Sequence, residues 1–291
     1  MENEQNDLYR KGCIIIFTSR FWGATKTLDR DQLGDLPEEI VHASRDLLIE
    51  TDKLEAVRGI IGDAKRFIKS NSMRFPIPGV DFINKSRISY VDNALKSKKA
   101  WAQDAVEDLI GTLESAKARY KAKYPDLYSE GNYPTAAQLR DNFKFEWDFR
   151  IISPPGKDLE VLSHEVYERC VADFKKQMEE FQSSLISTVA KEFYDRIDRL
   201  REQCIGGDVS ASTVKSVHTV LEKFGNVYEG CLDNKELQKM IDDIKMYLDG
   251  TDAAMLKSDS DFRNMVGGKM KEVTALMVNS KDPRLTRLLD I

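Results

Sequence analysis

Two long stretches of the chain repeat apolar residues every three or four positions, the spacing that places side chains on one face of an α-helix. The first runs from about Asp81 to Tyr124 without a proline, which predicts a helix of about 40 residues, roughly 60 Å long. The second runs from about Lys157 to Cys204, where twelve steps between apolar positions cover 45 residues, an average of 3.75. That average exceeds 3.6 and predicts a straight or slightly right-handed helix pair instead of a heptad coiled coil.

Two shorter segments have the pattern of β-strands. Apolar residues alternate with charged ones from Phe143 to Ile151, which predicts a strand with one buried face. Ile14–Phe17 is a short apolar run, and we expect the two strands to pair in a small sheet whose end is covered by Phe21 and Trp22. Five aromatic residues form the candidate packing or interaction cluster: Phe21, Trp22, Phe145, Trp147 and Phe149.

These elements predict a mainly α protein. We expect the two long helices to form an elongated antiparallel hairpin, similar to a coiled coil, with a small β element and a C-terminal bundle of shorter helices. The expected domains are residues 1–80 with a strand and short helices, 81–205 with the hairpin and a strand-bearing connection at about 125–156, and 206–291 with helices. In the first domain we expect helical periodicity to begin near Pro37 and "SMRFPIPGVDF" to form a loop, because its prolines cannot continue a helix.

Composition narrows the class of protein. Charged residues make up 32% of the chain and glycine and proline are scarce, which is typical of long exposed helices. The net charge of −5 gives no global attraction for nucleic acid or anionic membrane. The four cysteines form no CxxC pair, so we expect reduced, buried thiols. No apolar stretch reaches the roughly 20 residues of a membrane span, and the N-terminus lacks signal-peptide features, so we expect a cytoplasmic protein.

Reactive motifs are incomplete in this sequence. "MVGGKMK" lacks the first glycine of a phosphate-binding loop, and in "HEVYERC" Glu168 stands where a zinc-binding helix needs its second histidine. The carboxylates of Asp195 and Asp198 lie among arginines, as on a solvated helix surface with ion pairs. We therefore expect no catalytic residue, metal site or cofactor site, and hence a protein that is not an enzyme.

One basic patch on the first long helix is the candidate nucleic-acid surface, since cations neutralise phosphates and aromatic rings stack on unpaired bases. Trp101, Tyr120 and Tyr124 lie between its basic residues, although the same pattern fits the solvated face of a helix. The candidate contacts are Lys96, Lys98, Lys99, Lys117, Arg119, Lys121 and Lys123. A binding protein for single-stranded DNA or RNA is therefore one alternative function. A membrane-active helical protein that exposes residues 14–22 is the other, without stable membrane insertion.

The N-terminal region resembles a family of bacterial and phage proteins of unknown function, DUF3150. The likeness lies in Ile14–Phe17, Trp22-Gly23, Lys26-x-Leu28, "DRDQLGDLP" and "RFPIPG", over about residues 10–200. "FWGATK" is a loose version of the basic stretch of that family. The family assigns no catalytic residues, so none is carried over. The resemblance implies a phage or mobile-element context and a ring-forming AAA+ ATPase of the chelatase type as a partner.

The leading hypothesis is therefore a non-enzymatic interaction or scaffold protein. We expect it to act as an adaptor through its long helical surfaces and to associate with itself. The two alternatives above remain open at the level of sequence.

Overall fold

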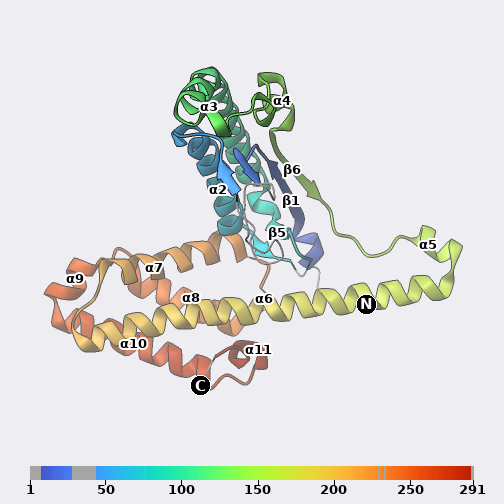
Figure 1. Ribbon diagram of the computed structural model, residues 1–291. Coiled ribbons are helices and arrows are strands. Elements are labelled where there is room, and N and C mark those ends of the chain that lie inside the picture. Colours follow the sequence, from blue (N-terminus) through green and yellow to red (C-terminus); the bar gives the residue numbers. More distant parts are fainter. Residues whose placement is uncertain (1–7, 28–43, 76, 229, 233, 290–291) are drawn as a thin grey trace, which may run out of the picture. The chain divides into compact units, whose positions relative to one another are not determined.

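The computed structural model describes residues 8–27, 44–75, 77–228, 230–232 and 234–289. The protein is mainly α-helical with a small β-sheet, which confirms the predicted fold class (Figure 1). Its two longest helices are α3 (Ile88–Lys123), with 36 residues, and α6 (His164–Gly206), with 43. The first helix begins later than predicted, because Val80–Asn84 is strand β5 and Lys85–Arg87 is the 3-10 turn η2.

The chain divides into two compact units. Unit 1 contains the residues up to Ile15, Ser70–Ile88, and those from Phe149 onward, whereas unit 2 contains Ile16–Lys69 and Ser89–Asp148. Helix α6 belongs to unit 1 and α3 to unit 2, so neither unit contains the expected hairpin of long helices. The units also follow a different division from the three consecutive segments expected from the sequence. The physical reason is that each long helix finds apolar partners within its own unit.

A four-stranded sheet has the order β4-β5-β1-β6. Strand β1 (Gly12–Arg20) lies next to β6 (Lys144–Arg150), as predicted from the two apolar segments. The segment expected to be a loop instead forms β4 (Met73–Arg74) and β5, which pair antiparallel with Met73 opposite Phe82. Gly79, with φ of 78°, makes the turn between them in a conformation that glycine adopts without steric cost.

Unit 2 is built around helices α3 and α2 (Asp52–Asn71). A second sheet pairs β2 (Thr25–Thr27) with β3 (Ser44–Asp46), and α4 (Ala136–Asn142) starts with a capping box of Thr135 and Gln138. The core includes Leu47, Leu54, Leu109, Leu113 and Leu139. The turns η3 (Pro125–Leu127) and η4 (Glu130–Asn132) lie between α3 and α4.

The helical region expected from Pro37 differs in the structure. Residues 28–43 lie outside the described residues, and Ser44–Asp46 is a strand. Helix α2 begins at Asp52 and continues for 20 residues through Gly59 and Gly62, which were expected to break it into shorter helices. Its apolar face outweighs the modest helix penalty of about 1 kcal/mol for each glycine.

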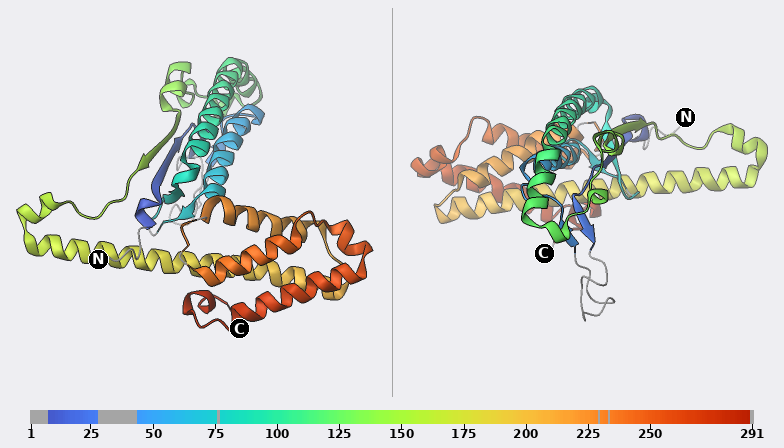
Figure 2. Two further views of the ribbon diagram at one scale, coloured as in Figure 1. Left: turned by 180° about the vertical axis from the view of Figure 1, so that it is seen from behind. Right: turned by 45° about the horizontal axis from the view of Figure 1, so that its top comes forward.

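The C-terminal half of α6 is the centre of unit 1. It packs against α7 (Ala211–Lys223), α10 (Ser260–Val278) and α11 (Pro283–Thr286), and α8 (Lys235–Leu248) and α9 (Ala253–Ser258) complete the bundle. Phe193, Ile197 and Leu200 on α6 are at most 1% exposed. The left view of Figure 2 shows these helices gathered along one end of α6. Burial of each such side chain stabilises the fold by about 1.5–3 kcal/mol.

The other end of α6 extends beyond this bundle. Only the 3-10 turn η1 (Leu8–Arg10) and the short helix α5 (Lys157–Leu162) are in repeated contact with it there among the described elements (Figure 1). Ser163 separates α5 from α6 and caps α6, since its side chain accepts a hydrogen bond from the Val166 amide. Gly207, with φ of 77°, ends α6 where the sequence predicted.

The cysteines agree with the expected reduced state. Cys13, Cys204 and Cys231 are buried free thiols, whereas Cys170 on the extending part of α6 is only partly buried. Burial raises the pKa of Cys231 to about 11, which makes its thiol a poor nucleophile at neutral pH.

Gly12 gives a test of the packing in unit 1. A Cβ atom at this position would collide with the carbonyl oxygen of Ile83 and lie 2.6 Å from Cζ of Phe82. We expect Gly12→Ala to lower the free energy of unfolding by about 1–3 kcal/mol, as overpacking does. Gly111→Ala is the control, because it meets nothing within 4 Å on α3 and should be neutral or stabilise by up to about 1 kcal/mol. Equal effects of both substitutions in urea unfolding would contradict this packing.

Candidate functional site

An open hollow of unit 1 lies beside α6, with a volume of about 830 Å³. Its apolar wall includes Phe75 and Phe181, whose rings meet edge to face with centroids 4.9 Å apart. Met178, Ile77 and Leu288 continue this wall. Ile77 is 55% exposed and Leu288 39%, so the hollow is open to solvent. Such a size and lining are typical of sites that take a ligand or an apolar side chain of a partner.

Polar groups also line this hollow. Three serines of α6 contribute, and Ser187 is 1% exposed with no hydrogen-bond partner for its Oγ among the described residues. Buried hydroxyl groups normally have a partner, so this atom is free to accept or donate one bond. Arg287 brings a guanidinium group to the rim from the end of α11.

A second hollow of about 510 Å³ shares Leu288 with the first. It is lined by Thr188, Lys191, Glu192, Asp195, Arg196 and Arg199 of α6. The two carboxylates have partners, because Asp195 is 3.7 Å from Lys191 and Glu192 accepts a hydrogen bond of 3.2 Å from Lys223. Arg196 and Arg199 are exposed and form no ion pair with any described residue. We call the two hollows together the α6 groove; it is apolar near Phe181 and basic near Arg199.

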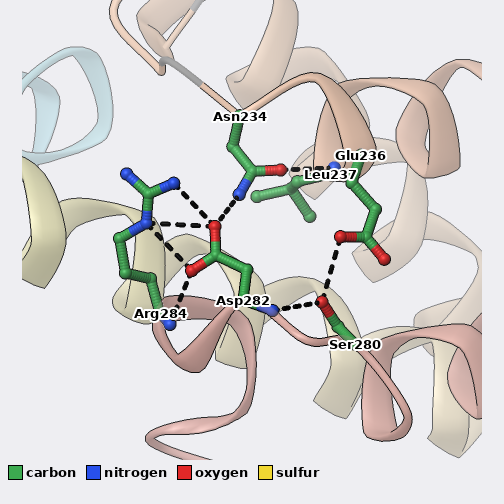
Figure 3. A network of polar contacts seen from close by, with 6 residues as sticks. All are labelled: Asn234, Glu236, Leu237, Ser280, Asp282 and Arg284. Carbon is green, nitrogen blue, oxygen red and sulfur yellow. Dashed lines mark hydrogen bonds and ion pairs between the residues drawn. The ribbon is translucent and has the colours of Figure 1, made fainter.

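A network of polar contacts holds α11 at the groove (Figure 3). Asn234 accepts a hydrogen bond of 2.8 Å from the Leu237 amide, which caps α8, and donates one of 2.7 Å to Asp282. Asp282 in turn accepts from the Arg284 amide, which caps α11, and pairs with the Arg284 guanidinium at 2.6 Å. One carboxylate therefore links the starts of two helices. We call Asn234, Asp282 and Arg284, with Glu236 and Ser280, the α8–α11 latch.

The latch fixes the position of the groove residues on α11. Leu285 and Leu289 are buried in the core of unit 1, and Arg287 and Leu288 lie between them at the rim. The Arg284 guanidinium is the main cause that holds the pKa of Asp282 below its usual range. Asn234 caps α8, and Asp259 caps α10.

Lys223 joins α6 to α7 beside the basic end of the groove. Its ammonium group is 3.2 Å from Glu192 and lies over the Tyr228 ring, 5.4 Å from the centroid. Burial opposes the charge, but Tyr228 and Glu192 outweigh it and raise the pKa of Lys223 above its ordinary value. Burial also raises the pKa of Tyr228, which leaves its hydroxyl protonated at neutral pH. This cluster is a packed ion pair, and it keeps Glu192 from neutralising the arginines of the groove.

A third hollow of about 710 Å³ surrounds the π-helical turn Phe224–Tyr228. His218 and Lys245 line it, but one ring nitrogen of His218 lies 2.9 Å from the Thr251 carbonyl oxygen. The Lys245 ammonium lies over the Phe224 ring, 5.8 Å from its centroid. The Lys245 contact holds the turn to α8. His218 and Lys245 thus both have a partner within the fold.

The candidate nucleic-acid residues all lie on α3 in unit 2, and four of the seven are in ion pairs. Lys98 pairs with Asp63, Lys96 lies 2.6 Å from Asp92, and Arg119 lies 3.0 Å from Glu50. Lys117 is the most enclosed, with its side chain 8% exposed and its ammonium 2.8 Å from Glu114 and 2.9 Å from Glu130. All four cations thus have a carboxylate partner, although the side chains of Lys96 and Arg119 stay 63% and 52% exposed.

The other three lysines lie over aromatic rings. Lys99 is 5.9 Å from the ring centroid of Trp147, Lys121 is 5.4 Å from that of Tyr128, and Lys123 is 5.4 Å from that of Tyr124. They are separated along α3, since Lys99 lies 22 residues before Lys121 and thus about 33 Å away. The structure therefore does not gather the predicted patch into one free basic surface.

Tyr133 organises the end of α3 where Lys117 lies. Its hydroxyl donates a hydrogen bond of 2.8 Å to the Leu47 carbonyl oxygen, and burial raises its pKa to about 12. Its ring contacts Tyr120 and Tyr128, with centroids 6.3 and 5.5 Å away. Tyr120, only 4% exposed, thus belongs to the packing of unit 2, whereas Tyr124 is 39% exposed and Trp101 58%.

The aromatic candidates are divided by the structure. Phe145 packs against Phe17 and Trp147, at centroid distances of 5.0 and 6.1 Å. Phe21 and Trp22 pack on the core of unit 2 that contains Leu47. There the ring centroids of Trp22 and Tyr133 are 6.4 Å apart. Phe149 belongs to unit 1. The five residues therefore pack in different parts of the structure and do not form one cluster.

The groove residues were not among the sequence candidates. Arg196, Arg199 and Arg201 were interpreted as an ion-paired surface with Asp195 and Asp198, yet only Arg201 has such a pair in the described structure, 2.7 Å from Asp198. No group of His, Cys, Asp and Glu among the described residues is arranged to hold a metal ion. Among the same residues, no helix is both long and apolar enough to cross a bilayer.

The fold and the groove define a mainly helical protein in two compact units with an open, partly basic surface groove. A family model described as "Protein of unknown function (DUF3150)" matches residues 10–268. The chain belongs to this family, as its N-terminal motifs predicted, and the match extends well beyond residue 200. No curated protein and no solved structure matches the chain.

The latch predicts a pH-dependent contribution to stability. We expect Asp282→Asn to lower the free energy of unfolding by about 1–3 kcal/mol at pH 7, because a charged hydrogen-bond acceptor is lost. The folded pKa of Asp282 lies below its ordinary value of 3.8, so this contribution is complete above that value and disappears as the pH falls through the folded pKa. Urea unfolding at pH 7 and pH 3 measures it.

Asp259→Asn is the matched control, because Asp259 caps α10 through the Asp261 and Phe262 amides and forms no ion pair with a described residue. A destabilisation by Asp282→Asn that is no larger than that of the control, or that does not decrease between pH 7 and pH 3, would argue against the latch.

Lys117 distinguishes a structural from a nucleic-acid role for the basic residues. We expect Lys117→Met to lower the free energy of unfolding by about 1 kcal/mol, since Glu114 and Glu130 lose a nearly enclosed partner. Lys121→Met replaces an exposed side chain and should stay within about 0.5 kcal/mol of the parent. Salt-dependent binding of single-stranded DNA that both substitutions weaken equally, without a change in stability, would instead support the nucleic-acid alternative.

Proposed function

We propose that this protein is a non-enzymatic adaptor or scaffold that binds a helical segment of a protein in the α6 groove. One observation supports this proposal most: an open apolar hollow of about 830 Å³ adjoins a pair of arginines without ion-pair partners among the described residues, on one long helix. An amphipathic helix recognises its receptor through apolar anchors in a groove and charges at the rim. The groove supplies an apolar hollow for such anchors and two arginines for acidic side chains at the rim.

We place the protein in the cytoplasm of a bacterium or of a phage-infected cell, and an AAA+ ATPase remains the partner that the family resemblance favours, beside a second copy of the chain.

The arrangement of unit 1 suits an adaptor. The latch and the buried Leu285 hold one wall of the groove, whereas α6 forms the other wall as a continuous helix. A preformed groove loses little conformational entropy when a partner helix enters it, so modest contacts give useful affinity.

Site-specific cross-linking in the host cell tests the proposal. A photoreactive phenylalanine analogue at Ile77, which is 55% exposed in the groove, should yield a covalent adduct with a protein. The same analogue at Ile205, which is 71% exposed on α6 outside the groove, is the matched control. Mass spectrometry of the adduct identifies the partner. Adducts that are equally abundant at both positions, or absent at Ile77, would contradict the groove as the binding site.

A further inference from the structure

One hydroxyl group in the α6 groove has no partner in the described part of the chain. Ser187 lies on α6 among the residues that line the apolar hollow, and it is 1% exposed. Its Oγ is shielded from water and forms no hydrogen bond with a described residue. The next residue shows the usual arrangement, because Thr188 donates a hydrogen bond of 2.8 Å to the Ser184 carbonyl oxygen one turn earlier. Ser187 therefore keeps a hydrogen-bonding capacity that the described fold does not use.

The walls of the hollow suit an aromatic ring. Phe75 and Phe181, which meet edge to face, are both buried, and so is Met178 in the same lining. A further ring gains from edge-to-face contact with such rings and from contact with a methionine sulfur. Ile77 and Leu288 are exposed apolar residues of this lining, so they mark the mouth of the hollow, whereas the buried rings lie at its floor.

A ring that enters through this mouth needs a polar atom at its far end to use the Ser187 hydroxyl. Phenylalanine has no such atom, and tryptophan carries its N–H on the side of the ring system. Tyrosine carries its hydroxyl opposite the point of attachment, and this hydroxyl both donates and accepts hydrogen bonds. The Ser187 Oγ changes direction by rotation about χ1 between staggered positions, so it can meet an incoming hydroxyl without a change in the helix backbone.

Charge at the rim favours acidic residues beside this tyrosine. Arg287 is exposed at the edge of the hollow and forms no ion pair with a described residue. Arg196 and Arg199 extend the positive charge along the groove. Glu180 brings a carboxylate to the same lining, but its carboxylate is 3.9 Å from the Lys176 ammonium. The rim is thus complementary to acidic side chains on a bound segment.

We propose that the protein segment bound in the α6 groove carries a tyrosine next to acidic residues. Its ring fills the apolar hollow, and its hydroxyl forms a hydrogen bond with Ser187. The proposal rests on the groove being a protein-binding site, and it names the side chain by which the partner is recognised. Tyrosine is enriched among the residues that dominate binding at protein interfaces, because its ring buries apolar area while its hydroxyl finds a partner.

Two short peptides that differ by one oxygen atom test this anchor on the purified full chain. Acetyl-Glu-Tyr-Glu-amide should bind about fivefold more tightly than acetyl-Glu-Phe-Glu-amide, because only the tyrosine hydroxyl gains a hydrogen bond from Ser187. Ser187→Ala should remove this preference and leave the affinity for the phenylalanine peptide unchanged. NMR titrations measure each dissociation constant.

Two variants of the same lining are the controls. Ser184→Ala removes an exposed hydroxyl from the hollow and should preserve the preference for the tyrosine peptide. Arg287→Gln should weaken both peptides by the same factor, since both carry the same acidic residues. The two controls separate the effect of the buried hydroxyl from that of the rim charge.

Urea unfolding of the free protein gives an independent readout. Ser187→Ala removes a hydroxyl without a partner among the described residues, so the midpoint of unfolding should stay the same or rise. A clear fall of the midpoint would show that the hydroxyl is bonded within the fold and would overturn the proposal.

The remaining outcomes separate the tyrosine anchor from the adaptor function. Equal affinity of the parent protein for both peptides overturns the anchor, and so does a preference that survives Ser187→Ala. The absence of binding by both peptides also overturns it, whereas an adduct at Ile77 with a host protein would still uphold the groove as a binding site.

Discussion

Burial of the C-terminal half of α6 is the interaction on which the candidate site depends. Phe193, Ile197 and Leu200 pack in a core that α7, α10 and α11 share, and this packing leaves the adjoining face of the same helix open. The open face becomes a groove because α11 flanks it. The apolar contacts of Leu285 and Leu289, together with the α8–α11 latch, hold Arg287 and Leu288 at its rim.

Polar contacts add to the apolar packing by fixing the positions of individual helices and side chains. Asp282 accepts hydrogen bonds from two helix starts and an arginine, so a single carboxylate fixes the relative position of α8 and α11. In unit 2 the same principle operates at Lys117, which two exposed carboxylates hold close to Tyr133. Basic residues that resemble a nucleic-acid surface in the sequence are in this way used within the fold. Arg196 and Arg199 differ, since they have no ion-pair partner in the described part of the chain and the neighbouring Asp195 and Glu192 pair with lysines.

Local patterns predicted most elements but not how they combine. Strict alternation identified β6, and helical spacing identified α3 and α6. The hairpin of long helices was expected because sequence neighbours usually pack together. The choice of partner depends instead on apolar surfaces far apart in the chain, such as Phe75 with Phe181, which no local pattern encodes.

The sequence by itself determined the helical class, the pairing of β1 with β6 and the family, because periodicity and short motifs are local properties of the chain. Only the tertiary structure decided which cations are free. Lys98, Lys117 and Arg119 find carboxylates contributed by other elements, whereas Arg196 and Arg199 find none among the described residues. The reason is that an ion pair depends on the distance between two side chains in space, and the fold sets that distance.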